Sequence, residues 1–362
     1  MPPVTLVTRY GSPVVRGRAL REWPRLARAG ALLVAFALGL VGCRSGDDGE
    51  AGATAAPVCD PASGTPEPGS DPGRITVGGL QREFVVHVPP GYDGTEPAPL
   101  VLNLHGFGGD IESQDTSTDL PDAAGERGYI VVTPQGAPLD VPEDSPAAAS
   151  AAGFEGVAFW NFFGSEPGDV TVNGETIPLA EIGADDVAFI DALLDTVTEE
   201  YCVDAERVFS TGMSNGAGMS TTLGCELGER FAAVAPVAGV NLSGACPGDD
   251  PVSVLAIHGD ADAIAGYTGD SLMGFDLGNP SVPERMAAWA RHDGCDVEPR
   301  VDDSTPGLVV TRWTGCDDGT DVELWTLAGW GHEWPRAESP TRPGVVDATE
   351  AVLDFFDAHG RG

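Results

Sequence analysis

Short apolar runs alternate with segments of helical periodicity along most of the chain. Nearly continuous apolar runs are typical of strands buried on both faces of a sheet. We expect such strands at residues 99–104, 129–132, 207–211, 231–237 and 252–257, and further strands near 308–310 and 322–325. Helical spacing predicts helices at 186–197, directly after 212–216, at 283–292 and at 346–359. This alternation predicts an α/β domain with a mostly parallel central sheet covered by helices on both faces.

Two local patterns refine this picture. Residues 75–88 predict two short strands joined at Gly78-Gly79, with Phe84, Val86 and Val88 on the face opposite His87. Asp185 or Asp186 is expected to cap the helix at 186–197, because a carboxylate accepts hydrogen bonds from free N–H groups at a helix start. The irregular stretch 137–183 contains one hairpin-like turn, at residues 172–175.

The N-terminal 42 residues have the character of an export signal. An arginine-rich start leads into an apolar run at 30–42, shorter than the about 20 residues of a spanning helix. Residues 40–43 resemble the bacterial lipobox, whose cysteine is lipidated after cleavage. We expect 1–42 to be a lipoprotein signal peptide and the lipid on Cys43 to be the only membrane attachment. A plain secretory signal or an uncleaved anchor is the alternative.

The next segment, 43–73, is acidic and rich in Ala, Pro, Gly and Ser, so we expect a flexible tether before a single folded domain at 74–362. The chain has no lysine and carries a formal net charge of −37. Without residues 1–42, which hold six arginines and one acid, that charge is −42. Such a surface argues against nucleic acid, anionic lipid headgroups and polyanionic substrates as partners.

Six cysteines follow Cys43, and an even number in an exported chain predicts disulfides. Cys295 and Cys316 flank one predicted strand region, which favours that pair. Cys225, on the helix after residue 216, can meet Cys246, in the loop after the next strand. That leaves Cys59 for Cys202. The alternative is metal ligation, but no CxxC pair is present, so we expect no metal site.

The pentapeptide 212–216 joins a predicted strand to a predicted helix and has Ser214 at its centre. A serine hydroxyl is a poor nucleophile unless it is presented to a base and an oxyanion site. A sharp strand-to-helix elbow does this, and its helix N-terminus faces the developing negative charge. Glycines flank the serine because a Cβ would clash in so tight a turn. A chain with 49 glycines also produces this pattern by chance, so an idle serine is the alternative.

Three other predicted strands end in residues that suit the same chemistry, as expected at the carboxyl edge of a parallel sheet. After 99–104 comes a glycine-rich loop, whose Phe107 N–H is expected to form an oxyanion hole with the N–H of Asn215. After 252–257 come Asp260 and Asp262, and we prefer Asp262 as the acid that orients a catalytic imidazole.

His332 follows the last predicted strand in a glycine-flanked loop and is expected to be the general base. His359 is the weaker competitor, and His87 and His292 have no comparable setting. The alternative is that His332 is a histidine of a surface loop without a catalytic role.

These motifs together resemble α/β-hydrolases of the secreted esterase group, which includes polyhydroxybutyrate depolymerase-like and feruloyl esterase-like proteins. The resemblance implies a serine esterase without cofactor, with Ser214 as nucleophile, Asp262 as orienting acid and His332 as base. It also supports the disulfides of Cys225 and Cys295. Two departures concern Ala217, where a second glycine is usual, and Tyr267, which lacks a preceding proline. The matching pieces are residues 104–106, 185–189, 212–216, 258–262 and 331–335.

The expected substrate is a carboxylic ester of the feruloyl or acetyl type found on plant polysaccharides, or a short polyhydroxyalkanoate. Trp160 and Trp334 are expected to line the substrate site as aromatic walls, and ordinary core packing is the alternative. The same choice applies to Phe162, Phe163 and Trp330. A non-catalytic surface-binding lipoprotein and a serine peptidase are the alternative functions.

Overall fold

The computed structural model describes residues 59, 67–139, 156–162, 183–241, 246, 248–269, 280–337 and 344–361, and the backbone of 169–172 and 175–178. All of these belong to one compact unit, while a second unit, 10–57, lies outside them. The predicted signal peptide, Cys43, most of the predicted tether and Phe163 also lie outside the described residues.

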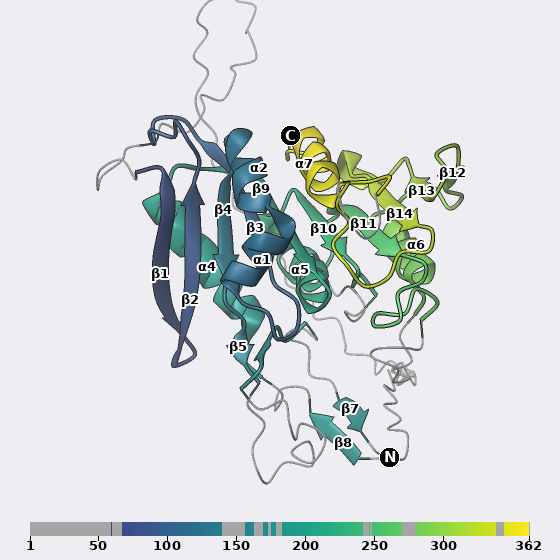
Figure 1. Cartoon of the computed structure of the whole chain (residues 1–362), viewed down its shortest axis with the longest axis horizontal. Coiled ribbons are helices and arrows are strands. Elements are labelled where there is room, and N and C mark those ends of the chain that lie inside the picture. Colours follow the sequence, from purple (N-terminus) through teal and green to yellow (C-terminus); the bar gives the residue numbers. More distant parts are fainter. Residues whose placement is uncertain are drawn as a thin grey trace, which may run out of the picture. The chain divides into compact units, whose positions relative to one another are not determined.

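The centre of the fold is a sheet in the order β1-β2-β4-β3-β9-β10-β11-β14-β13-β12 (Figure 1). The six strands from β4 to β14 are parallel, whereas β1, β2, β13 and β12 add antiparallel edges. This confirms the predicted mostly parallel sheet. Its strands are β1 (Gly69–Val77), β2 (Leu80–Val88), β3 (Ala98–Leu104), β4 (Ile130–Pro134), β9 (Val203–Met213), β10 (Ala233–Val237), β11 (Ser253–Gly259), β12 (Arg300–Asp302), β13 (Leu308–Trp313) and β14 (Val322–Leu327).

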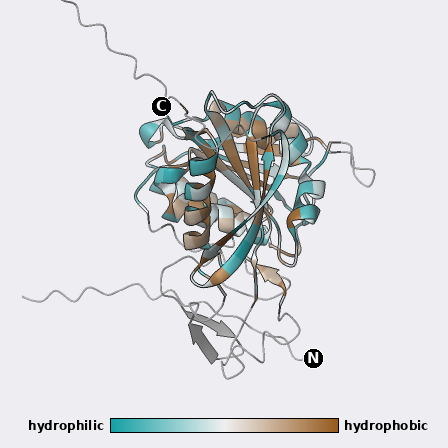
Figure 2. Ribbon diagram, turned by 90° about the vertical axis from the view of Figure 1, so that its left-hand side faces the viewer, coloured by the Kyte–Doolittle hydropathy of each residue, from teal (hydrophilic) through white to brown (hydrophobic). Residues whose placement is uncertain are grey.

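Helices cover both faces of this sheet, because alternate side chains of its buried strands point to opposite sides. In β3, Leu100 and Leu102 belong to one apolar cluster and Val101 to the other. The first cluster includes α4, α5 and α6, and the second includes α2 and α7. Figure 2 shows hydrophobic residues concentrated in the central strands. The helices are α1 (Ile111–Thr118), α2 (Leu120–Glu126), α4 (Asp186–Glu200), α5 (Asn215–Glu226), α6 (Val282–His292) and α7 (Ala348–Ala358).

Smaller elements lie in the loops between these strands and helices. The predicted hairpin is present, since β7 (Asp169–Val172) pairs antiparallel with β8 (Glu175–Pro178). A second pair joins β5 (Ala137–Pro138) to β6 (Ala158–Phe159). The short 3₁₀ helices are η2 (Gly228–Arg230) and η3 (Asp317–Gly319). No helix of the described residues is both long and apolar enough to cross a bilayer.

The folded part starts earlier than the predicted boundary at residue 74. Strand β1 begins at Gly69, which pairs with Val88 at the far end of β2. Backbone pairing needs no apolar side chains, so the composition of this segment hid the strand. Gly73 is required there because a side chain would overlap the ring of Phe84. The disulfide of Cys59 with Cys202 attaches the chain to the folded domain at a residue that precedes β1.

The other two disulfides join Cys225 to Cys246 and Cys295 to Cys316, as the local arguments favoured. Asp185 is the N-cap of α4, accepting from the N–H of Ala188.

Candidate active site

Ser214 lies at a sharp turn between the end of β9 and the start of α5. Its backbone has φ 57° and ψ −118°, a strained conformation for a residue with a side chain. Two hydrogen bonds of 3.0 Å hold it there: Ser214 N–H donates to Val237 O, and Gly218 N–H donates to Ser214 O. Strain of this kind persists only where the surroundings impose it, and it is typical of functional sites.

The glycines on both sides of Ser214 are required by close packing against β3. A Cβ on Gly212 would lie 2.7 Å from the carbonyl oxygen of Leu104, and one on Gly216 would lie closer still to that atom. Ala217, a departure from the family pattern, is accommodated because residue 239 is also glycine: a Cβ there would lie 2.9 Å from the Ala217 methyl group. The elbow is therefore packed without room for larger residues.

Asp262 and His332 meet in the loops that follow β11 and β14. Nδ1 of His332 lies 2.8 Å from Oδ2 of Asp262, which is within hydrogen-bond distance. Asp260 instead accepts a hydrogen bond from the N–H of Gly329, in the loop that leads to His332. The geometry thus favours Asp262 over Asp260 as the carboxylate that orients the imidazole.

The surroundings of Asp262 keep its carboxylate ionised. Its Oδ1 accepts from the N–H groups of Ile264 and Ala265, at 2.8 and 2.9 Å. Its Oδ2 lies 3.3 Å from Nε2 of His258. Burial raises the pKa of Asp262, but the hydrogen bonds from His258 and His332 outweigh that effect and hold this pKa well below its usual range.

The sequence did not predict that His258 contacts Asp262. The imidazole is buried, and its Nε2 also lies 2.8 Å from the carbonyl oxygen of Ala265, so Nε2 must carry a hydrogen. Its Nδ1 has no hydrogen-bond partner among the described residues. We therefore assign the ring hydrogen to Nε2. The signal was present, because His258 begins the 258–262 motif that contains the acid.

The glycine-rich loop after β3 lies directly beside the elbow. A Cβ on Gly106 would lie 3.6 Å from the Cβ of Ser214. His105, which opens the loop, is fully buried, and that burial lowers the pKa of its imidazole. Nδ1 of His105 donates to Gly106 O at 2.7 Å, and Nε2 accepts from the N–H of Gly136 at 2.9 Å. His105 is therefore a neutral structural residue that shapes the loop carrying Phe107.

No family model matches the chain. Feruloyl esterase C of Emericella nidulans is 30% identical over 280 residues, which cover 76% of this chain and 84% of that enzyme. The chain belongs to the family of this esterase. Feruloyl esterase D of Neurospora crassa is 29% identical over 286 residues, covering 77% of this chain and 83% of that enzyme.

Acetyl xylan esterase from Aspergillus awamori shares the fold, with a TM-score of 0.50 and 16% identity over 79% of this chain and 99% of that one. The protein is thus an α/β-hydrolase and a carboxylic ester hydrolase of the serine hydrolase type.

Two aromatic residues expected to line the substrate site of this esterase are buried instead. Trp160 is 0% exposed and its Nε1–H donates to His105 O at 3.0 Å. Trp334 is 7% exposed and its Nε1–H donates to Thr349 Oγ1 at 3.0 Å. Core packing, the alternative interpretation, accounts for both, because their polar N–H groups already have partners inside the protein. Phe162 and Trp330 are also buried.

In the glycine-rich loop after β3, the side chain of Phe107 reaches solvent and is 39% exposed. Its ring contacts Phe159 edge-on, with centroids 6.2 Å apart.

His359 and His87 have partners away from the loops that carry Ser214, Asp262 and His332. His359 bonds to Phe355 O and Asp321, and His87 to Asp115. In the described part of the chain, no group of three or more His, Cys, Asp or Glu side chains is arranged to hold a metal ion.

Proposed function

We propose that the esterase cleaves its substrate through an acyl-enzyme formed on Ser214, with His332 as general base and Asp262 as orienting acid. The observation that carries this proposal is the 2.8 Å contact between His332 and Asp262. Both lie in loops at the carboxyl ends of β11 and β14, the same edge at which β9 delivers Ser214. Nucleophilic catalysis by serine requires a nucleophile, a base and a group that orients the base, and the ends of three parallel strands carry residues for these three roles.

The protonation states follow from these hydrogen bonds. An ionised Asp262 accepts from Nδ1–H of His332, which leaves Nε2 of His332 as the proton acceptor. Nε2 takes the hydroxyl proton as Ser214 Oγ attacks the ester carbonyl carbon. The imidazolium then protonates the departing alcohol oxygen as the C–O bond breaks. Water attacks the acyl-serine with the same base, releasing the carboxylic acid and restoring the serine.

The developing oxyanion needs N–H donors close to Ser214. We propose the backbone N–H groups of Phe107 and Asn215 for this role. Asn215 is the first residue of α5, and the first N–H groups of a helix have no acceptor within the helix. Gly106 places the Phe107 loop beside Ser214. Each such donor is worth about 10²- to 10³-fold in kcat.

We infer that the acyl group is a hydroxycinnamoyl group of the feruloyl type. The names of the two fungal relatives support this class, and the exposed ring of Phe107 offers an aromatic surface beside the elbow. Acetyl esters and short polyhydroxyalkanoates are the competing substrates. We also infer that the enzyme is exported, since three disulfides suit an oxidising compartment, and that a lipid on Cys43 anchors it.

Replacement of the nucleophile tests the proposal. The wild type is expected to hydrolyse p-nitrophenyl acetate and methyl ferulate, and Ser214→Ala is expected to lower kcat at least about 10³-fold, because the residual rate comes from binding and the oxyanion hole alone. Ser210→Ala is the matched control, since Ser210 lies on the same strand and bonds to Ser220 at 2.9 Å. Turnover that persists in Ser214→Ala would exclude the acyl-enzyme.

A further inference from the structure

The side chain of Asn215 forms a reciprocal pair with the backbone of Trp160. The N–H of Trp160 donates to Oδ1 of Asn215 at 2.8 Å, and Nδ2 of Asn215 donates to the carbonyl oxygen of Trp160 at 2.9 Å. Both residues are buried. Two opposed hydrogen bonds fix both the position and the rotation of the amide group. The residue whose N–H is a proposed oxyanion donor is thus attached to a segment outside the elbow.

Trp160 also binds the loop that carries the other proposed donor. Its indole N–H donates to the carbonyl oxygen of His105 at 3.0 Å, and its ring centroid lies 5.1 Å from that of His105. On α4, Phe189 stacks on the indole with an interplanar angle of 10°. Trp160 is therefore a spacer between the loop after β3 and the start of α5, the two segments whose separation sets the width of the oxyanion hole.

A buried ion pair contacts the backbone of the residue that follows Trp160. The N–H of Asn161 donates to Oδ2 of Asp186 at 2.7 Å, while Oδ1 of Asp186 lies 2.6 Å from Nη1 of Arg82. The side chains of Arg82 and Asp186 are 3% and 1% exposed. Burial raises the pKa of Asp186, and Arg82 opposes that shift. A buried ion pair adds little net stability, so its contact with the segment that carries Trp160 points to a positional role.

The network closes on itself through residues that follow β4. Nη2 of Arg82 donates to the carbonyl oxygen of Gln135 at 3.0 Å. The side-chain amide of Gln135 lies 3.1 Å from Nε2 of His105. His105 is thus held from two sides, by Trp160 at its carbonyl oxygen and by Gln135 at its ring. A closed network of largely buried groups resists small displacements better than a single contact does.

We propose that Trp160 is a positioning residue of the oxyanion hole, which it acts on through Asn215 and His105. This inference rests on the acyl-enzyme mechanism proposed above. Backbone donors stabilise the oxyanion only at about 2.7–3.1 Å from the position it will occupy. A wider gap between the loop after β3 and α5 lengthens the hydrogen bonds to the oxyanion, which reduces stabilisation of the transition state. Binding of the substrate in its ground state is left unchanged. Trp160 is therefore expected to affect kcat and to leave KM unchanged.

The test compares Trp160→Phe with Trp289→Phe. Trp289 is a matched control, because it is buried and its indole N–H also donates to a backbone carbonyl, Val252 O, at 3.0 Å. Each variant keeps an aromatic ring and deletes one buried hydrogen bond. We expect Trp160→Phe to lower kcat for p-nitrophenyl acetate about tenfold with KM unchanged, and Trp289→Phe to keep the wild-type kcat. Phenylboronic acid, which forms a tetrahedral adduct on a serine, should bind Trp160→Phe about tenfold more weakly.

Equal kcat values for the two tryptophan variants would overturn the positioning role. If Trp160→Phe does not fold, Asn215→Ala replaces it, since this change removes the reciprocal pair and keeps the backbone N–H. The same loss of kcat and of boronate affinity is expected, and a wild-type kcat in Asn215→Ala would again overturn the proposal. Ser214→Ala separates the two hypotheses: its inactivity together with an unaffected Trp160→Phe contradicts only the positioning role.

Discussion

Asp262 illustrates how much of this site depends on single hydrogen bonds. Four donors surround its two oxygens, from the N–H groups of Ile264 and Ala265 and the rings of His258 and His332. Because these donors lower its pKa, the carboxylate stays charged throughout the mildly acidic and neutral range. Its contribution to stability is present above the ordinary value of 3.8 and is lost as the pH falls below it. A charged Asp262 can therefore accept from Nδ1–H of His332 throughout that range.

Asp262→Asn tests this role at the level of one atom. An amide at this position can donate to Nδ1 of His332, which moves the ring proton to Nε2 and blocks acceptance from Ser214. We expect kcat to fall about 10³- to 10⁴-fold with little change in KM. Steady-state kinetics with p-nitrophenyl acetate provide the measurement. Asp260→Asn is the control, because its remaining oxygen still accepts from Gly329. Equal losses in the two variants would argue against Asp262 as the orienting acid.

At the scale of elements, the sequence predicted best those segments whose environment is uniform. Strands β3 and β11 and residues 208–212 of β9 are buried, so their apolar runs were visible without knowledge of the fold. Helices α4 and α6 were visible because each buries one face. Strand ends then placed Asp262 and His332 near each other, since parallel strands share a carboxyl edge.

Elements held by polar contacts were not predictable in the same way. Helix α1 was missed because Ile111–Thr118 is almost entirely polar, and its one local signal is the capping box of Asp110 and Ser113. The aromatic residues around Trp160 indicated an apolar segment, but the sequence did not reveal whether their side chains face the core or the substrate site. The partners of Trp160 come from the loop after β3 and from α5, so only the assembled fold reveals that its indole points inward.

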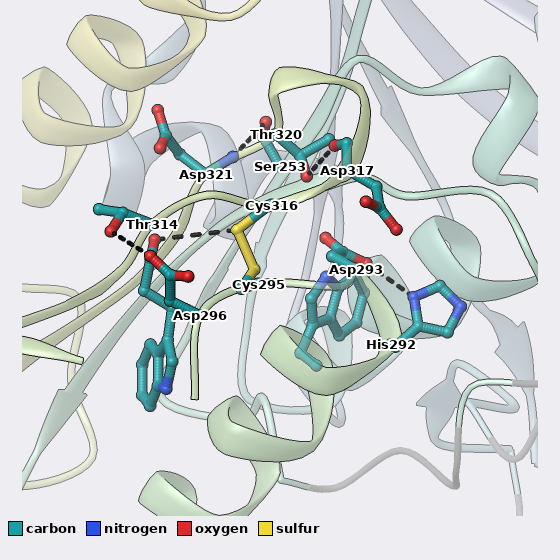
Figure 3. Close-up of a disulfide and its surroundings, with 12 residues drawn as sticks. Ser253, His292, Asp293, Cys295, Asp296, Thr314, Cys316, Asp317, Thr320 and Asp321 are labelled. Atoms are coloured by element: carbon teal, nitrogen blue, oxygen red, sulfur yellow. Dashed lines mark hydrogen bonds and ion pairs between the residues drawn. A yellow bond between two sulfur atoms is a disulfide. The ribbon is translucent and has the colours of Figure 1, made fainter. Parts of the chain in front are cut away.

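The end of α6 contains a pH-sensitive contact beside the Cys295–Cys316 disulfide (Figure 3). Nδ1 of His292 lies 2.7 Å from Oδ1 of Asp293, and Nε2 lies 2.7 Å from the carbonyl oxygen of Gly248. Both ring nitrogens thus face acceptors, which favours the imidazolium. Burial lowers the pKa of His292, but Asp293 and Gly248 outweigh it, so the net shift is upward. Burial raises the pKa of Asp293 to about 6.

His292→Gln is expected to reduce the pH dependence of stability. A raised pKa in the folded state means that the His292 contribution is fully present below about 6.5 and is lost as the pH rises through the folded value. Wild-type unfolding midpoints should therefore fall by about 1–3 °C more than those of His292→Gln between pH 6.5 and 9. Differential scanning calorimetry measures both. Asp293→Asn should show the same reduced dependence, and an unchanged pH dependence in both variants would contradict the assignment.

At the scale of the whole molecule, the charge and the predicted N-terminal signal lead to one expectation. The chain without residues 1–42 carries a formal charge of −42 and has no lysine. We expect such a surface to be repelled by anionic lipids and not to bind a membrane electrostatically. If the enzyme is retained at a membrane, we expect that retention to come from an acyl group inserted in the bilayer, for which Cys43 at the end of the apolar run is the candidate.

Cys43→Ala is expected to release the enzyme from the membrane without changing its chemistry. The wild type should remain with the membrane fraction in both 0.05 M and 1 M NaCl, because insertion of acyl chains does not depend on salt. It should also partition into the detergent phase of Triton X-114, whereas Cys43→Ala should be found in the aqueous phase. Equal kcat for methyl ferulate in the two proteins would show that the substitution acts on attachment alone. Release of the wild type by salt, or retention of Cys43→Ala in the detergent phase, would contradict lipid anchoring at Cys43.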